Sequence, residues 1–232
     1  MKLTTFLAIA LTLSAFAEEP VNWQIAGTKP LVLQGWGTVR DSYGLARFSQ
    51  KSNSLSVEVA GGGADFGYAE KVGPSVLGEV EGDFEATVTI QPGMSPDGTY
   101  ATSNRVLWNG AGLLVEKDDG NYVRLEVTVR QPAGKKADNR IWANHAIRKT
   151  GTWDQPELKG WDPKKPMYLR IQRTGPQFKW GYSYDKEKWT ELKPFEAKDW
   201  PAKLKIGVLF VNLTTKVQKV TVSDLKITPL VK

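Results

Sequence analysis

Hydrophobic and polar residues alternate along most of the chain with a period of two, which is the spacing of a strand that buries one face. The clearest alternating runs are Leu55–Val59, Phe84–Ile90, Val123–Val129 and Leu169–Ile171, and further strands are expected at Phe178–Tyr184, Leu204–Asn212 and Val217–Thr228. Long stretches with helical periodicity are absent beyond the N-terminal apolar run. The pattern therefore predicts an all-β sandwich of two packed antiparallel sheets with these core residues: Phe84, Val88, Leu125, Val127, Leu169, Ile171, Val208 and Phe210.

Turn-forming residues separate the predicted strands. Asp118-Asp119-Gly120-Asn121 is a strong hairpin signal because Asp, Gly and Asn tolerate the positive φ of tight turns, and it should join Gly112–Glu116 to Tyr122–Arg130. A second tight turn is expected at Thr174-Gly175-Pro176. The segments 61–78 and 131–166 are long and rich in Gly, Pro, Asn and Asp, so we expect ordered loops there, where binding residues usually lie.

The N-terminus has the three regions of a secretory signal. Met1-Lys2 is followed by the apolar run Leu3–Leu13 and then by Ser14-Ala15-Phe16-Ala17, so cleavage is expected after Ala17. The apolar run is shorter than the roughly 20 residues that a membrane helix needs, and no membrane insertion is expected. The sequence thus predicts a signal peptide at residues 1–17, one domain at residues 18–232, and a secreted or periplasmic protein.

Composition narrows the possible partners. The chain has 31 Lys+Arg against 25 Asp+Glu, a formal net charge of +6, and no Cys, which excludes disulfides, zinc thiolates and thiol nucleophiles. The Lys residues are interspersed with Glu and Asp, which favours a mixed solvated surface, with a patch for an acidic polymer as the alternative. For an exported protein, an acidic polysaccharide is a better expectation than nucleic acid.

Several short motifs occur in the order found in one known family. They are Ala64-Asp65-Phe66, Val80–Glu85, Ala111–Val115, Asp118–Glu126, Tyr168–Ile171 and Tyr182–Asp185 with Trp189. Over roughly Val59 to Ile227 the chain resembles the domain of unknown function 1349 family. The resemblance implies a concanavalin A-like jelly roll, the architecture of legume lectins, laminin G-like modules and many glucanases. It brings no established activity or site residues, and a shared fold does not transfer function. The stretch Arg130 to Trp161 is longer than in that family, so specificity is expected there.

The sharpest enzyme signal is Glu81-Gly82-Asp83-Phe84-Glu85. Alternation would place Glu81, Asp83 and Glu85 on one strand face, and family 16 glycoside hydrolases use such a trio as nucleophile, helper and acid/base. Here Gly82 opens the strand and Glu81 is expected in the preceding turn. A solvated strand face is therefore the favoured interpretation, with a catalytic trio as the alternative.

The nine Trp residues are the most informative excess. Trp23, Trp180, Trp189 and Trp200 lie in or beside predicted strands and are expected in the core, whereas Trp36, Trp108, Trp142, Trp153 and Trp161 lie in Gly-, Asn- or Pro-rich segments. Flat indole faces stack on pyranose rings, while Asn and Arg pair with hydroxyls. The candidate ligand site is therefore Arg105, Trp108, Asn109, Trp142, Asn144 and His145. The alternative is that these Trp residues fasten long loops to the sandwich.

The hairpin also predicts where two of these residues meet. Trp108 and Trp142 lie beyond the far ends of its two strands, so we expect them to be neighbours at one end of the sheet.

Cofactor signals are weak. A single His cannot build a two-His metal site, and Gly61-Gly62-Gly63 lacks the following helix of a phosphate loop. Asp118 and Asp119 could bind calcium, but the hairpin explains them without an ion. We expect no cofactor. The leading hypothesis is a secreted, non-catalytic carbohydrate-binding module; the alternatives are a glycoside hydrolase or polysaccharide lyase on the same fold, and a structural or protein-interaction domain of the laminin G-like kind.

Overall fold

The computed structural model describes residues 31–66, 73–95, 106–118, 120–132, 135–147, 150–158, 161–162 and 164–230. Several sequence predictions lie outside these residues, namely the signal peptide with its cleavage after Ala17, and the positions of Trp23, Arg105 and Asp119. Every regular element within the described ranges is a β-strand. Accordingly, none of these residues belongs to a helix with the length and apolar character needed to span a bilayer.

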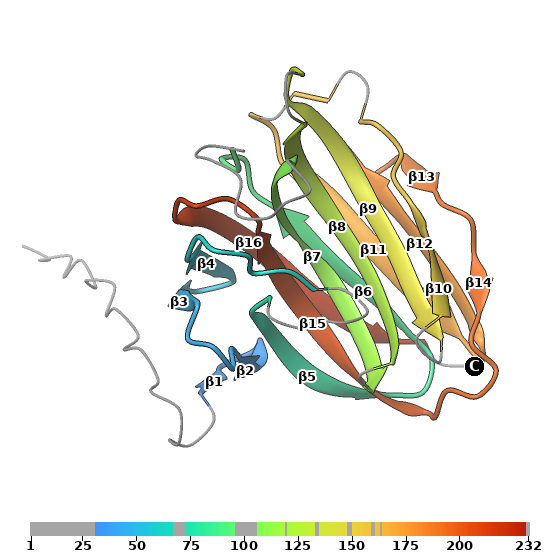
Figure 1. Ribbon diagram of the computed structural model, residues 1–232. Helices are drawn as coiled ribbons and strands as arrows, with labels where there is room; N and C mark the ends of the chain where they lie inside the picture. Colours follow the sequence, from blue (N-terminus) through green and yellow to red (C-terminus); the bar gives the residue numbers. More distant parts are fainter. Residues whose placement is uncertain are drawn as a thin grey trace, which may run out of the picture.

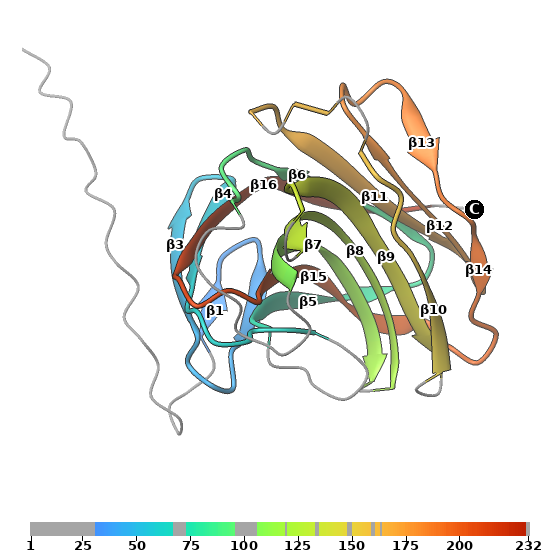
Figure 2. The ribbon, with the colours of Figure 1, turned by 45° about the horizontal axis from the view of Figure 1, so that its top comes forward.

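The strands form two antiparallel sheets that pack into a sandwich (Figure 1). Sheet A holds, in spatial order, β1 (Val32–Leu33), β2 (Gly37–Arg40), β5 (Ser75–Glu81), β15 (Lys203–Asn212), β7 (Val106–Asp118), β8 (Asn121–Pro132), β9 (Asp138–Ile147) and β10 (Thr150–Asp154). Sheet B holds β13 (Trp189–Glu191), β12 (Gln177–Ser183), β11 (Met167–Thr174), β6 (Phe84–Ile90), β16 (Gln218–Pro229), β4 (Ser54–Val59) and β3 (Ala46–Lys51), with β14 (Phe195–Glu196) beside β12. Figure 2 shows the same two layers from a second direction.

The core lies between the sheets and follows the period of two. All eight predicted core residues are at most 2% exposed, from Phe84 in β6 to Phe210 in β15. Aromatic rings bridge the layers; Phe48 of sheet B meets Phe210 of sheet A edge to face, with centroids 6.4 Å apart. The prediction of a two-sheet sandwich is therefore confirmed.

The predicted hairpins are also present. Strand β7 pairs with β8 through the turn after Asp118, whose Oδ1 accepts hydrogen bonds from Gly120 N at 2.8 Å and Asn121 Nδ2 at 2.7 Å. Strand β11 pairs with β12 through Gly175, which has φ 57°, and Gly175 N donates to Asp83 Oδ1 at 2.7 Å. Aspartate side chains thus stabilise both turns.

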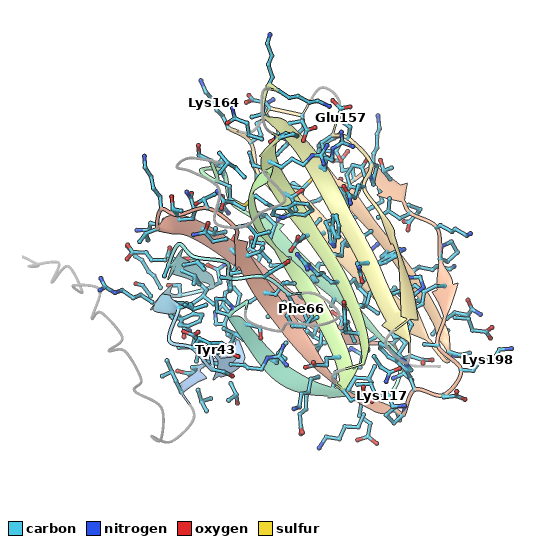
Figure 3. The ribbon with its side chains drawn as sticks, in the orientation of Figure 1. Tyr43, Phe66, Lys117, Glu157, Lys164 and Lys198 are labelled. Carbon is cyan, nitrogen blue, oxygen red and sulfur yellow. The ribbon has the colours of Figure 1, made fainter. Side chains whose placement is uncertain are left out.

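One prediction about the long segments was wrong. Much of the stretch 131–166 is not a loop, because it contains β9 and β10, which extend sheet A beyond β8. Strands β9 and β10 form a hairpin that widens sheet A. Charged side chains such as Lys117, Glu157, Lys164 and Lys198 project at the periphery of the molecule (Figure 3).

Candidate functional site

The outer face of sheet A, which points away from sheet B, is largely covered. Phe66 packs there against Tyr122, with ring centroids 5.2 Å apart, and Figure 3 labels Phe66 in front of the sheet. A second apolar cluster, separate from the core between the sheets, consists of Phe66, Leu77, Leu114, Tyr122, Leu209, Val211 and Leu213, with Trp108 packed against it. Strand β8 is consequently buried on both faces over most of its length.

Trp108 and Trp142 meet on this face. Their ring centroids are 4.5 Å apart and the rings are inclined at 76°, an edge-to-face contact across β8. The expected neighbourhood of the two residues is thus present. Both are partly exposed, yet the Nε1 atom of each is buried and makes no hydrogen bond of ordinary geometry with the described residues. Atoms other than the indole N–H therefore make up the exposed part of each residue.

Two other predicted site residues point the opposite way. Side chains alternate across a strand, so Asn109 faces away from Trp108, and Asn109 Nδ2 donates to Ser95 O. His145 likewise faces the sandwich interior, where its ring stacks on Phe195 with centroids 4.1 Å apart and an angle of 4°. Burial lowers the pKa of His145. Asn109 and His145 are therefore not part of the tryptophan face, and their assignment to it was wrong.

A buried ion pair lies beneath the two indoles. Arg124 Nη2 is 2.7 Å from Glu126 Oε1 and Arg124 Nε is 3.1 Å from Oε2, so the pair is bidentate. Arg124 also donates to Phe66 O and lies 3.5 Å from Asp65 Oδ1. Burial raises the pKa of the Glu126 carboxyl, and the Arg124 guanidinium opposes that shift. The Arg124 guanidinium in turn lies 5.8 Å from the Trp142 ring centroid.

The remaining predicted residue, Asn144, belongs to this group. It is buried on β9 directly opposite Arg124 in the strand register, two positions beyond Trp142 on the same face. The outer face therefore combines Trp108, Trp142 and Asn144 with a fixed pair of opposite charges.

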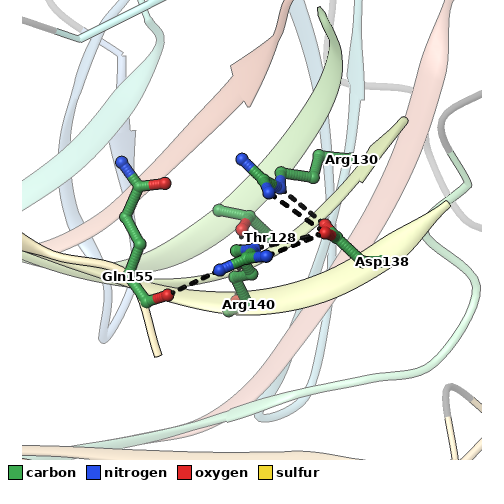
Figure 4. Close-up of polar contacts among 5 residues, drawn as sticks. All are labelled: Thr128, Arg130, Asp138, Arg140 and Gln155. Carbon is green, nitrogen blue, oxygen red and sulfur yellow. Dashed lines mark hydrogen bonds and ion pairs between the residues drawn. The ribbon is translucent and has the colours of Figure 1, made fainter. Parts of the chain in front are cut away.

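A second charged cluster, drawn in Figure 4, lies next to Trp108 in the strand register. The Asp138 carboxylate accepts hydrogen bonds from Arg130 Nε at 2.6 Å and from Arg140 Nη2 at 3.0 Å. Arg140 Nη1 donates a further hydrogen bond to Gln155 O at 3.0 Å. Hydrogen bonds from both guanidinium groups lower the pKa of Asp138 against the opposing effect of burial. Arg130 lies opposite Trp108 in the register of β7 and β8. The single negative charge of Asp138 is thus shared by two guanidinium groups, so this cluster carries a net positive charge beside the indoles.

Sequence reasoning overlooked these arginines. Arg124, Glu126 and Arg130 occupy the polar positions of β8, and a half-buried strand would expose them. The available signal was the Arg-x-Glu spacing, which puts opposite charges side by side on one strand face. This spacing alone does not indicate that the pair is buried, because the sequence does not show that Phe66 covers this face.

The alternative catalytic trio is divided between the two sheets. Glu81 ends β5 in sheet A, where it lies opposite Lys203, whereas Glu85 belongs to β6 in sheet B. Between them Gly82 has φ 82° and Asp83 accepts the Gly175 N–H. The alternative, in which alternation aligns the three carboxylates on one strand face, is therefore contradicted, and Glu81 lies at the end of a strand rather than in the expected turn.

The described ranges contain no group of three or more His, Cys, Asp or Glu residues suited to hold a metal ion. Of the Trp residues expected in loops, Trp36 is instead buried in the core at 5% exposure, and Trp161 packs against that core from its edge. Trp189, expected in the core, lies on the outer face of sheet B.

Comparison with solved structures identifies the architecture. A functionally unknown protein from Saccharomyces cerevisiae is similar over 80% of this chain and 92% of its own, with a TM-score of 0.64 and 16% identity. The chain is a jelly-roll β-sandwich. This agrees with the expected concanavalin A-like architecture. No protein-family model and no curated protein matches the chain, so membership of the resembled family stays a prediction.

Two further structures share the jelly roll. The GH43 protein BlXynB from Bacillus licheniformis is similar over 82% of this chain, with a TM-score of 0.55 and 11% identity, and the chain spans only 38% of its length. Rv0315, described as an immunostimulatory antigen and pseudo beta-1,3-glucanase of Mycobacterium tuberculosis, is similar over 92% of this chain and 91% of its own, with a TM-score of 0.50 and 12% identity. At these identities the similarity establishes the fold alone.

Proposed function

We propose that the protein is a secreted, non-catalytic carbohydrate-binding module that holds a glycan on the outer face of sheet A. The observation that carries the proposal is the edge-to-face pair of Trp108 and Trp142, which is partly exposed while both indole N–H groups are buried. Carbon surface of this kind suits the C–H face of a pyranose ring. Export rests on the predicted signal sequence ending at Ala17.

The surrounding charges would fix the orientation of the sugar. Arg130 and Arg140 are 19% and 24% exposed and are held in place by Asp138, so their guanidinium groups can donate to sugar oxygens without losing further side-chain freedom. Arg124 and Glu126 are fully inside, and their role is to support Trp142 from below. A few placed polar groups beside an apolar surface are the usual composition of a small-molecule site.

The two indoles should contribute unequally. Arg124 lies over the Trp142 ring, whereas no described residue places a cation over Trp108. We therefore propose that Trp108, whose ring no described cation engages, contributes more to stacking with a ligand. Proteins of the same fold carry names that refer to carbohydrate chemistry, a GH43 protein and a pseudo beta-1,3-glucanase, which is compatible with a glycan as ligand.

The experiment is a glycan array with the purified protein, followed by calorimetric titration of the glycan that binds. Trp108→Ala should weaken affinity by about 1–3 kcal/mol, which is roughly tenfold to a hundredfold, and Trp142→Ala should weaken it less. Tyr43→Ala is the matched control, because Tyr43 is a 68% exposed aromatic on a distant turn. If folded Trp108→Ala and Trp142→Ala proteins bind as the wild type does, the proposed site is wrong; release of shortened products from the bound glycan would show a hydrolase or lyase instead.

A further inference from the structure

A groove on the outer face of sheet B has no role in the site described above. It has a volume of about 530 Å³. Strands β6 and β11 supply its floor, including Thr87, Thr89 and Arg170. Lys186 and Trp189 border it on one side, and the residues Asp224 to Lys226 of β16 border it on the other. The size is that of an ordinary ligand cleft.

A bulge in β16 shapes one wall. The register between β16 and β6 shifts between Ser223 and Lys226, and Asp224 within this bulge has φ 55°. The Asp224 carboxylate accepts hydrogen bonds from Asn53 Nδ2, and from Thr89 Oγ1 at 3.2 Å. Bulges redirect side chains out of the regular alternation. The charge of Asp224 is thus engaged in holding the wall in place.

The arginine in the floor is also engaged. Arg170 lies 4.3 Å from the Trp189 ring centroid, forms an ion pair with Glu191, and has Nη1 4.0 Å from Glu85 Oε2. Cation, ring and carboxylates therefore fix one another. Arg170 therefore adds no free positive charge to the groove, and its two carboxylate neighbours exceed it by one negative charge.

Two lysines are different. Lys186 Nζ lies 4.8 Å from the Tyr168 ring centroid, but no described carboxylate lies within 4.0 Å of it, and the same holds for Lys226 Nζ. Lys226 belongs to β16, which pairs with β6 on one side, whereas Lys186 lies over Tyr168 of β11, which pairs with β6 on the other. The two lysines therefore stand on opposite sides of the groove. Neither ammonium group therefore has a described carboxylate partner, and an anionic ligand could supply one.

We propose that this groove binds an acidic glycan, with Lys186 and Lys226 receiving carboxylates of separate sugar units. Tyr168 and Trp189 border the same groove and offer ring edges to the sugar backbone, while Thr87 and Glu85 can exchange hydrogen bonds with hydroxyl groups. The site is on the opposite side of the sandwich from Trp108, so it does not depend on the function proposed for sheet A.

The test compares an acidic oligosaccharide with its methyl ester, in which each carboxylate has lost its charge and gained a methyl group. A short oligogalacturonate and its fully methyl-esterified counterpart are titrated into the protein by calorimetry, with oligomannuronate as a second acidic probe. We expect the acidic forms to bind more tightly than the ester and to lose affinity as salt is added, because screening weakens exposed charge pairs. Lys186→Gln and Lys226→Gln should each weaken binding about threefold, and the double variant about tenfold.

Control variants locate the site. Lys219→Gln removes an exposed lysine from the same strand outside the groove, and should leave affinity unchanged. Trp108→Ala should also leave it unchanged, which separates this proposal from the one for sheet A. Equal binding of the ester, equal losses in Lys219→Gln, loss of binding in Trp108→Ala, or no binding of either acidic probe at millimolar concentration would each overturn the proposal.

Discussion

Gly110 on β7 leaves the space that the carboxylate of Glu126 on β8 occupies. A Cβ atom at position 110 would lie 3.0 Å from Glu126 Cδ and 3.1 Å from Oε1, closer than an ordinary contact. The absence of a side chain at position 110 thus allows the buried carboxylate to reach its place beneath the two indoles.

Gly110→Ala should therefore destabilise the protein, because the added methyl group would displace a carboxylate that Arg124 holds on the other side. We expect a loss of about 1–3 kcal/mol in the free energy of unfolding, measured by urea denaturation. In a Glu126→Ala background the same change should cost clearly less, since the atoms it meets are gone. Strictly additive effects would show that the two positions are independent.

Removing one member of the Arg124 and Glu126 pair should be costly. Glu126→Leu leaves a buried guanidinium with only Asp65 nearby, and we expect a loss of about 3–5 kcal/mol in unfolding free energy. The double variant Arg124→Met with Glu126→Leu should recover much of that loss, because it removes both buried charges. The control is Lys203→Gln, which breaks an ion pair with Glu79 whose side chains are 60% and 64% exposed, and should have no measurable effect.

Removing the Asp138 carboxylate should cost less stability than removing the Glu126 carboxylate, because the Asp138 side chain is 22% exposed. Asp138→Asn weakens the hydrogen bonds that hold Arg130 and Arg140, and we expect a loss of about 1–2 kcal/mol near neutral pH. The pKa of Asp138 is lowered in the folded protein, so its contribution is present above its ordinary value of 3.8 and disappears as pH falls through the folded pKa. Wild type and Asp138→Asn should converge in stability on strong acidification; an unchanged gap would contradict this.

Period-two alternation predicted the interior of the sandwich because each inward residue, such as Leu125 or Phe210, is apolar. The same pattern assigned Arg124 and Glu126 to solvent. Arg124 is buried because Phe66, far away in sequence, lies over it, and Glu126 is buried beneath Trp108 and Trp142; no local pattern reports such coverage. Strand β9 was missed although Ile141 and Ala143 alternate with Trp142, because Asn and Ala are unfavourable in strands.

The candidate site was half predicted for a related reason. Trp108 and Trp142 are neighbours as predicted, but both lie in strands, β7 and β9, on either side of β8, and not in loops beyond the strand ends. Asn109 and His145 were grouped with them by proximity in sequence, but one step along a strand moves a side chain to the other face. Glu81 and Glu85 are apart for a different reason. The turn at Gly82 carries the chain from sheet A to sheet B between them.

His145 should make the protein sensitive to mild acid. Its ring lies between the sheets against Phe195, and burial lowers its pKa below the ordinary value of 6.5. Between that lowered pKa and 6.5 the unfolded chain binds more protons at this position than the folded protein, so stability rises with pH in this window. Above 6.5 the contribution is constant, because the imidazole is neutral in both states.

His145→Phe isolates this effect, because it removes the titrating group and keeps an aromatic ring against Phe195. Unfolding free energies of both proteins should be measured from about pH 8 to about pH 5, across the range in which histidine titrates. Other groups titrate alike in the two proteins, so the difference between them reports position 145. We expect wild type to lose more stability than His145→Phe as pH falls below 6.5. Parallel curves would mean that solvent reaches the imidazole and that its burial does not oppose protonation.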